Sequence, residues 1–287
     1  MHYADTNAIL ADAGKTLQGG PVGLIFIEDD HEVASTLAHM GKLGFGHLIA
    51  VCNAQTTLPD DVPENLHRLD CDVTADGILQ TVINSLITAL PGAWLSYCFN
   101  AEYIFFPFCE HRSVPEMLHF MQEERRDTVM SYIVDLYAAD LGAHPSGVDR
   151  ESACFDKSGF YALARKDALG EVLDRQLDIS GGLRWRFEEH IARDRRRVDR
   201  VTFFRAQAGL EMQPDRTFNI AEYNTHSCPW HNNLTAAVAS FRTAKALRRN
   251  PGSRGAISSF HWSQSERFDW SSQQLLDCGM MEPGQWF

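Results

Sequence analysis

The chain has 287 residues, of which 44% are hydrophobic, so it can bury a substantial core and is not expected to be disordered. A formal net charge of −12 at pH 7 disfavours nonspecific binding to nucleic acid or anionic lipid, which requires a broad basic surface. No apolar run approaches the roughly 18 residues typical of a membrane span, and the first residues lack the basic-then-apolar order of a secretion signal. We therefore expect a cytoplasmic protein.

The first part of the chain alternates between predicted strands and helices. Residues 22–27 and 47–52 are short, continuous apolar runs typical of buried parallel strands, and residues 30–43 have apolar side chains at helical spacing. Asp29 or Asp30 is expected to cap that helix, and Gly44 to end it. Further elements are predicted in this order: a strand at 66–69, a helix over 75–90, a strand from Trp94, a helix over 114–124 and a strand over 128–136. This alternation predicts a mostly parallel sheet of about five strands.

The rest of the chain has shorter and less regular signals. We expect a loop over residues 142–159, a turn at 180–182, a linker over 250–255 and a helix over 270–278 that ends at Gly279. Basic residues gather at 193–200 and 245–249, which we interpret as solvated helix faces. The predicted organisation is an N-terminal extension (1–20), a main domain (21–249) with halves of about 21–140 and 141–249, and a C-terminal linker and helix (250–287).

Several well-known site motifs are missing from the sequence. It contains no G-x-G-x-x-G, Walker lysine loop, G-x-S-x-G elbow or H-E-x-x-H. The seven cysteines are scattered without a C-x-x-C pair, which favours neither a disulfide framework nor a zinc ribbon. His226, Cys228 and His231 are metal-binding residue types close together, but a metal needs three or four converging ligands, and we predict no metal site there.

Two arginines and one glutamate are candidate ligand-binding residues. If residues 180–187 are extended, Arg184 and Arg186 lie on one face, where guanidinium groups suit phosphate oxygens. An exposed strand with both charges facing water is the alternative. Glu102 follows the apolar run that begins at Trp94, so it is a candidate base or ligand at a strand end, or simply a solvated carboxylate.

Several segments together carry a family resemblance. Glu28 and Asp29 follow the first strand, His39 precedes a Leu-Gly-Phe segment by four residues, and Val-Cys-Asn-Ala-Gln-Thr-Thr spans 51–57. Residues 94–107 begin with tryptophan and end with proline, and later landmarks occur at 134–137, 155–156, 181–187, 225–227 and 240–242. In this order and spacing, the segments resemble bacterial family 2-like glycosyltransferases with a GT-A fold. The resemblance implies an α/β, GT-A-like, mostly parallel sheet flanked by helices, with an α+β acceptor-side extension.

The resemblance also shows which acids are missing. Family members hold a divalent cation, Mn²⁺ or Mg²⁺, with an Asp-x-Asp pair, and another aspartate contacts the nucleoside. The matching positions here are Cys52, Phe99 and Ala101, which are not ligands for a hard cation, so we expect no metal site and no certain cofactor. Only Glu102 of the acidic cluster is kept. A register shifted by one residue offers Asn100 and Glu102 as a substitute pair, but it breaks the match at both ends of the segment.

The resemblance implies roles for particular residues. Donor-binding candidates are Asn53, Asn100, Glu102, Arg184, Arg186 and Arg242, of which the arginines could offset diphosphate charge. His226 lies on the acceptor side. Asp135 and Asp156 are the candidates for a catalytic base that deprotonates the acceptor hydroxyl in an inverting reaction.

Three hypotheses for function follow. The first is transfer of a hexose from a nucleotide-sugar donor to a glycan or other polar acceptor. The second is a pseudo-enzyme that keeps the fold and binds a glycan or a protein partner. The third is an unrelated nucleotide-binding or hydrolytic α/β protein, which the missing phosphate and nucleophile motifs disfavour.

Overall fold

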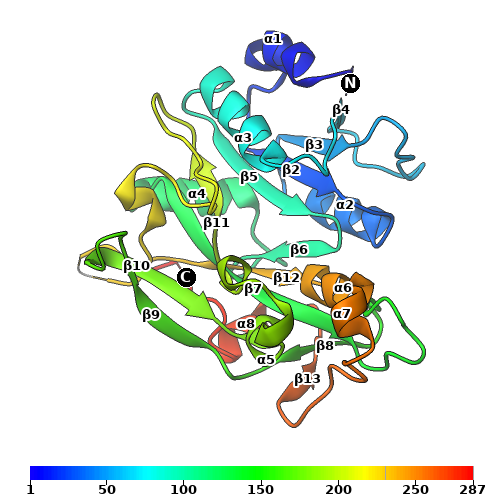
Figure 1. Ribbon diagram of the computed structural model, residues 1–287. Coiled ribbons are helices and arrows are strands. Elements are labelled where there is room, and N and C mark those ends of the chain that lie inside the picture. Colours follow the sequence, from blue (N-terminus) through cyan, green and yellow to red (C-terminus); the bar gives the residue numbers. More distant parts are fainter. Residues whose placement is uncertain (230, 287) are drawn as a thin grey trace. The chain divides into compact units, whose positions relative to one another are not determined.

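A computed structural model describes residues 1–229 and 231–286 (Figure 1). It shows a mixed α/β fold with a large sheet whose first strands are parallel, flanking helices and a small antiparallel hairpin. The chain forms two compact units. The first contains Met1–Tyr103, His111–Val129 and Val201–Asn224, and the second contains Ile104–Glu110, Met130–Arg200 and the residues from Thr225 on. The units are therefore interleaved in sequence, whereas the predicted halves are each continuous.

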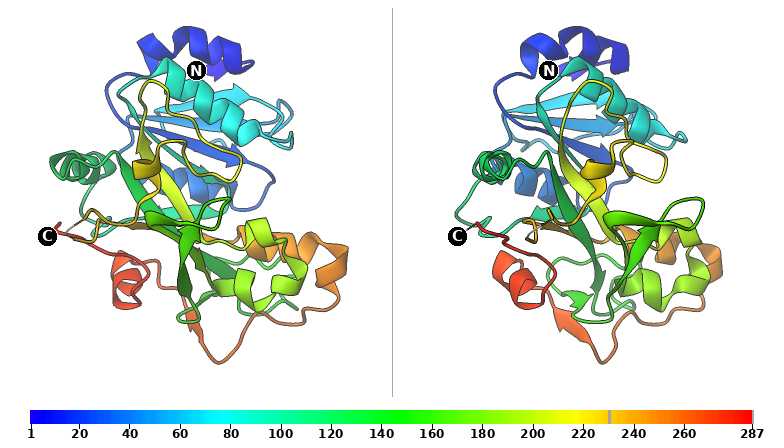
Figure 2. Two further views of the ribbon diagram at one scale, coloured as in Figure 1. Left: turned by 60° about the vertical axis from the view of Figure 1, so that its left-hand side comes forward. Right: turned by 90° about the vertical axis from the view of Figure 1, so that its left-hand side faces the viewer.

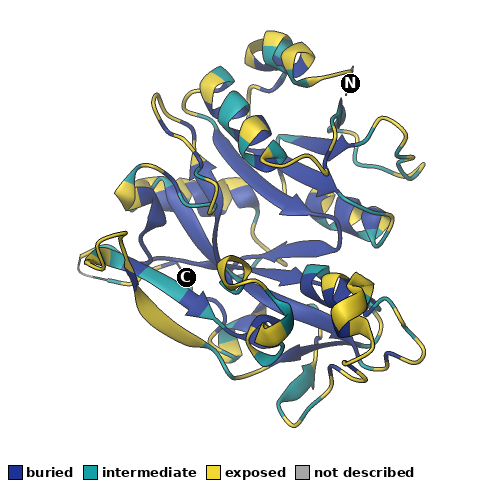
Figure 3. Cartoon of the chain, in the orientation of Figure 1, coloured by how far each residue is buried: buried dark blue, intermediate teal, exposed yellow. Residues whose placement is uncertain are grey.

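The first unit is built on a sheet with the strand order β1, β4, β3, β2, β5, β11. The strands are β1 (His2–Tyr3), β2 (Val22–Ile27), β3 (His47–Cys52), β4 (Leu66–Asp70), β5 (Trp94–Phe99) and β11 (Asp199–Arg205). The first five of that order are parallel, and β11 is antiparallel to β5. Every residue of β2 and β5 is buried (Figure 3), as continuous apolar runs predict for strands covered on both faces. The predicted strands in this region are confirmed.

Four helices belong to the first unit, namely α1 (Thr6–Thr16), α2 (Val33–Lys42), α3 (Ile78–Ala89) and α4 (Val114–Glu123). Asp5 caps α1, which packs against α3 (Figure 2). Ser113 and Glu116 form a capping box at α4. The predicted cap of α2 is wrong: its N-cap is Glu32, with φ of 55°, because the Asp29 carboxylate accepts the N–H of His31 in the preceding turn.

The second unit combines a short sheet with a hairpin. Strand β7 (Thr128–Ala138) is parallel to β12 (Ala236–Ser240) and antiparallel to β8 (Ala153–Asp156), which pairs with β13 (Ser265–Arg267). Strands β9 (Tyr161–Lys166) and β10 (Val172–Ser180) form the hairpin. The remaining elements of this unit are α5 (Gly182–Arg186), α6 (Arg242–Arg249), α7 (Pro251–Arg254), α8 (Ser272–Asp277) and two 3-10 turns (Glu188–His190, Arg193–Arg195). A third 3-10 turn (Ala221–Asn224) belongs to the first unit, and β6 (Glu102–Phe105) is divided between the two. No helix in the described part of the chain is long and apolar enough to cross a membrane.

Three predictions for the second half are corrected. The loop over 142–159 contains strand β8, whose buried residues pair with β7. The linker over 250–255 contains α7, because Asn250 caps it and Pro251 fits its first turn. Residues 182–186 are helical rather than extended.

Candidate functional site

The parallel strands of the first unit create a switch point between β2 and β5. From β2 the chain proceeds to β3 and β4 on one side, and β5 then pairs with the other side of β2. In open α/β sheets, ligands bind beyond the carboxyl ends of the strands at such a point. The residues that follow these ends are Glu28 and Asp29 after β2, Asn53 after β3 and Asn100 after β5. The candidate functional site is therefore this edge.

Asn100 organises the chain that follows β2. Its side chain is completely buried, and its Oδ1 accepts the backbone N–H of Glu28 at 2.9 Å. Its Nδ2 donates to Asp29 Oδ1 at 2.6 Å and to the carbonyl oxygen of His31 at 2.8 Å. The loop requires one hydrogen-bond acceptor and two donors at this position. A neutral amide provides all three, whereas an ionised carboxylate can only accept. We call these residues, 28–31 with Asn100, the switch-point loop.

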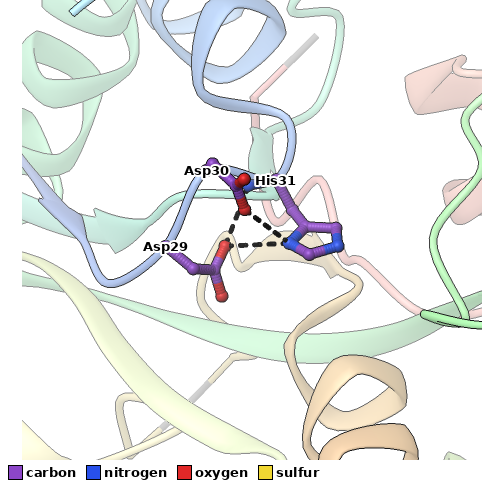
Figure 4. Close-up of side chains that lie close together, drawn as sticks. All are labelled: Asp29, Asp30 and His31. Atoms are coloured by element: carbon purple, nitrogen blue, oxygen red, sulfur yellow. Dashed lines mark hydrogen bonds and ion pairs between the residues drawn. The ribbon is translucent and has the colours of Figure 1, made fainter. Parts of the chain in front are cut away.

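Asp29, Asp30 and His31 lie close together in that loop (Figure 4). The Nδ1 of His31 is 3.4 Å from Asp29 Oδ1 and 3.3 Å from Asp30 Oδ1, and one ligand atom of each residue lies within 4.8 Å of the others. Among residues 1–229 and 231–286, this is the one such group of potential metal ligands. However, Asp29 is already engaged by Asn100, and the Asp30 side chain is 96% exposed. We therefore assign no cation to it.

The positions that carry acids in the family that the sequence resembles do not fit a metal here. Cys52 is buried, and burial raises the pKa of its thiol, so it stays protonated at neutral pH. Phe99 and Ala101 have no ligand atom in their side chains. Glu102 is buried, and its Oε2 accepts the N–H of Phe99 at 3.0 Å. This carboxylate therefore stabilises the turn between β5 and β6, and we derive no step through a metal.

The turn at Ala101 has a second support that sequence reasoning missed. Ala101 has a φ of 61°, in the left-handed region, and its N–H donates to Thr36 Oγ1 at 2.9 Å. Thr36 is buried in α2, where its hydroxyl donates to the carbonyl oxygen of Glu32. The signal available in the sequence was a threonine within the apolar pattern of the predicted helix.

Asn53 lies in a loop that an unpredicted arginine holds. Arg68, in β4, forms an ion pair with Asp70 at 2.7 Å and donates to the carbonyl oxygens of Asn53, Ala54 and Thr56. The Oδ1 of Asn53 accepts the N–H of Val73 at 3.3 Å. The loop after β3 is thus fixed at the same edge as the switch-point loop. A charged residue inside an otherwise strand-like pattern was the signal for Arg68.

The predicted base Asp135 and the predicted phosphate ligand Arg184 form a pair in the second unit. Asp135 is fully buried, and Arg184 Nε lies 3.4 Å from its Oδ1. Burial raises the pKa of Asp135, and Arg184 opposes that shift. A Cβ atom at Gly182, whose φ is 60°, would lie 3.1 Å from Asp135 Oδ2. The positive φ and this close approach both favour glycine at the start of α5.

Asp156 and Arg186 form a second pair. Arg186 Nε lies 3.2 Å from Asp156 Oδ2, and the other carboxylate oxygen accepts from Tyr137 at 2.5 Å and from Trp262 Nε1 at 2.7 Å. Burial raises the pKa of Asp156, while the Tyr137 hydrogen bond and Arg186 lower it. Arg186 also donates to the carbonyl oxygen of Phe260. Arg184 and Arg186 therefore both have acidic partners within the unit.

The remaining candidates lie elsewhere in the second unit. Arg242 begins α6, and its N–H donates to Ser240 Oγ at 3.2 Å. His226 is buried, its ring stacks on Tyr132 at 6.1 Å, and burial lowers its pKa. Within the described residues, His226, Cys228 and His231 do not form a group of converging metal ligands.

A cavity of about 640 Å³ occurs in the first unit, at the opposite edge of the sheet. It is lined by residues that precede or begin β2 and β5, among them Pro21 and Trp94, and by Leu118 of α4. Parallel sheets bind their ligands at the carboxyl edge, and the ordered polar groups gather there. We therefore place the candidate site at the switch-point loop and not in this cavity.

Comparison with known proteins identifies no relative: no protein-family model matches the chain, and no curated protein matches it.

Proposed function

We propose that this protein is a GT-A-like glycosyltransferase that binds a nucleotide-sugar donor at the switch-point loop and transfers its hexose to a glycan or other polar acceptor. The observation that carries the proposal is the position of Asn100 and Asn53 at the carboxyl ends of β5 and β3, on both sides of β2. A switch point of this kind is where open α/β sheets bind nucleotides. The resemblance in sequence runs through the same strands.

The proposed donor site works without a metal. The amide of Asn53 and backbone N–H groups at the ends of parallel strands can bind a ribose or a base through hydrogen bonds, while the buried Asn100 positions the loop. The acids that would ligate a cation are replaced by Phe99 and Ala101, and the acid that would contact the nucleoside is replaced by Cys52. Donor binding should therefore be insensitive to Mn²⁺. We also retain the cytoplasm as the proposed location.

A pseudo-enzyme is the second candidate, and a specific observation favours it. Asp135 and Asp156, the predicted bases, are buried and paired with Arg184 and Arg186, an arrangement that suits stability better than proton transfer. Such a protein would use the same fold to bind a glycan or a partner without transferring a sugar.

Calorimetry and a transfer assay separate these candidates. The chain is titrated with UDP-glucose and GDP-mannose in EDTA and again with Mn²⁺, and release of the nucleoside diphosphate is measured with mixed oligosaccharide acceptors. Metal-independent binding together with release of the diphosphate supports the transferase. Binding without release supports the pseudo-enzyme. An absence of donor binding under every condition refutes the transferase.

A further inference from the structure

Trp185 is exposed to solvent although the chain on both sides of it is anchored. Its side chain is 41% exposed, and it lies in α5 between Arg184 and Arg186. Arg184 pairs with Asp135, and Arg186 pairs with Asp156. Two buried ion pairs therefore hold the backbone that presents this indole. A single exposed apolar side chain is common on protein surfaces, so the meaning of this tryptophan depends on what lies beside it.

A second indole approaches Trp185 across a glycine. Gly159 has a φ of 90°, and a Cβ atom there would lie 3.4 Å from Trp185 Cζ3 and 3.9 Å from Trp262 Cη2. Trp262 is half-buried and fixed by its hydrogen bond to Asp156 and by the Arg186 guanidinium, 4.8 Å from its ring centroid. These are ordinary van der Waals distances, so both rings lie next to Gly159.

Polar side chains flank the same segment. Ser158, next to the glycine, donates to Gln264 Oε1 at 3.1 Å. Lys157 and Glu266 form an ion pair at 3.4 Å, with 46% and 39% of their side chains exposed. The cores of protein–protein interfaces are depleted in charged residues, so these surroundings favour a polar ligand.

We propose that Trp185 and Trp262 form an aromatic platform that binds a pyranose ring of a glycan. The faces of aromatic rings carry negative charge and attract the weakly positive C–H groups of a sugar, while the hydroxyl groups hydrogen-bond to polar neighbours. The ligand class rests on the proposed function, since it is the acceptor of that reaction. Asp156 then holds Trp262 in place through the indole N–H.

The test is a fluorescence and calorimetric titration of the full chain with cellotetraose, chitotetraose and mannotetraose. We expect saturable binding of at least one of them that Trp185→Ala weakens at least about tenfold and Trp185→Phe weakens less. Leu169→Ala is the matched control, because Leu169 is 87% exposed on the hairpin, and it should bind as the wild type does. Equal thermal melting of these variants shows that they fold.

Three results overturn the platform. The first is a wild-type protein that binds none of the three oligosaccharides, and the second is a Trp185→Ala variant that binds them as well as the wild type does. The third is self-association in sedimentation that depends on Trp185, which identifies a second copy as the occupant. Titration with UDP-glucose keeps the two proposals separate. We expect Trp185→Ala to bind this donor as the wild type does. If the wild-type protein does not bind the donor, that result counts against the proposed function alone.

Discussion

Replacement of Asn100 tests the switch-point loop most sharply among single substitutions. Asn100→Ala removes one hydrogen bond from the N–H of Glu28, one to the carbonyl oxygen of His31 and one to the carboxylate of Asp29. The two neutral bonds contribute about 1 kcal/mol each and the bond to the charged group about 2 kcal/mol, so unfolding should become easier by about 4 kcal/mol. Asn100→Asp keeps the bond from Glu28 but places a second carboxylate beside Asp29. We expect a similar loss at neutral pH that shrinks in acid, where the new carboxyl group can donate.

Urea unfolding followed by circular dichroism measures these losses. Asn7→Ala is the control, since Asn7 is exposed on α1, and it should change the free energy of unfolding by no more than about 0.5 kcal/mol. A loss below about 1 kcal/mol for Asn100→Ala, or an Asn100→Asp variant as stable as the wild type at neutral pH, refutes the reasoning.

The other predictions concern buried charged groups. Arg184→Ala leaves a buried carboxylate without its main partner and should cost about 3–5 kcal/mol of unfolding free energy in urea. Arg112→Ala breaks an exposed pair and should cost less than about 1 kcal/mol, and equal losses would contradict this difference. Glu102→Gln keeps an oxygen that can accept the same backbone N–H, so calorimetry should give a donor affinity within about twofold of the wild type; a larger loss would give the carboxylate a direct role. Burial lowers the pKa of His226 below 6.5, so the unfolded chain takes up a proton first, and stability falls as the pH drops below about 6.5. His226→Phe should reduce that slope in urea titrations between about pH 7 and 5, and His119→Gln, at a side chain 75% exposed, should not; equal slopes would contradict the assignment.

The strands around the candidate site could be predicted because local sequence determines them. The runs at 22–27 and 47–52 are continuously apolar, and the structure places β2 and β3 at the same residues. Asn53 and Asn100 follow strands, so their position at one edge of the sheet could be inferred. What Asn100 does there could not, because its partner Glu28 is 72 residues away in the sequence.

The helix at Trp185 shows why other predictions failed. Charged and apolar residues alternate over 184–187, which is typical of a strand. The structure instead anchors Arg184 and Arg186 to Asp135 and Asp156, so tertiary ion pairs override the local pattern. From the sequence, Arg184 and Arg186 were candidates for phosphate binding, but in the structure they pair with acids of the same unit. The spacing of nearby residues could not predict these pairs, because Asp135 and Asp156 are far away in the sequence.

The central claim is that the donor binds at the switch-point loop, and hydrogen–deuterium exchange with and without UDP-glucose in EDTA tests it most directly. With the donor bound, we expect the backbone amides of residues 28–31 and of the loop 53–56 to exchange more slowly than without it. Ordered polar groups follow the strand ends in both segments. Unchanged exchange at saturating donor, or protection confined to the cavity around Pro21 and Trp94, would contradict it.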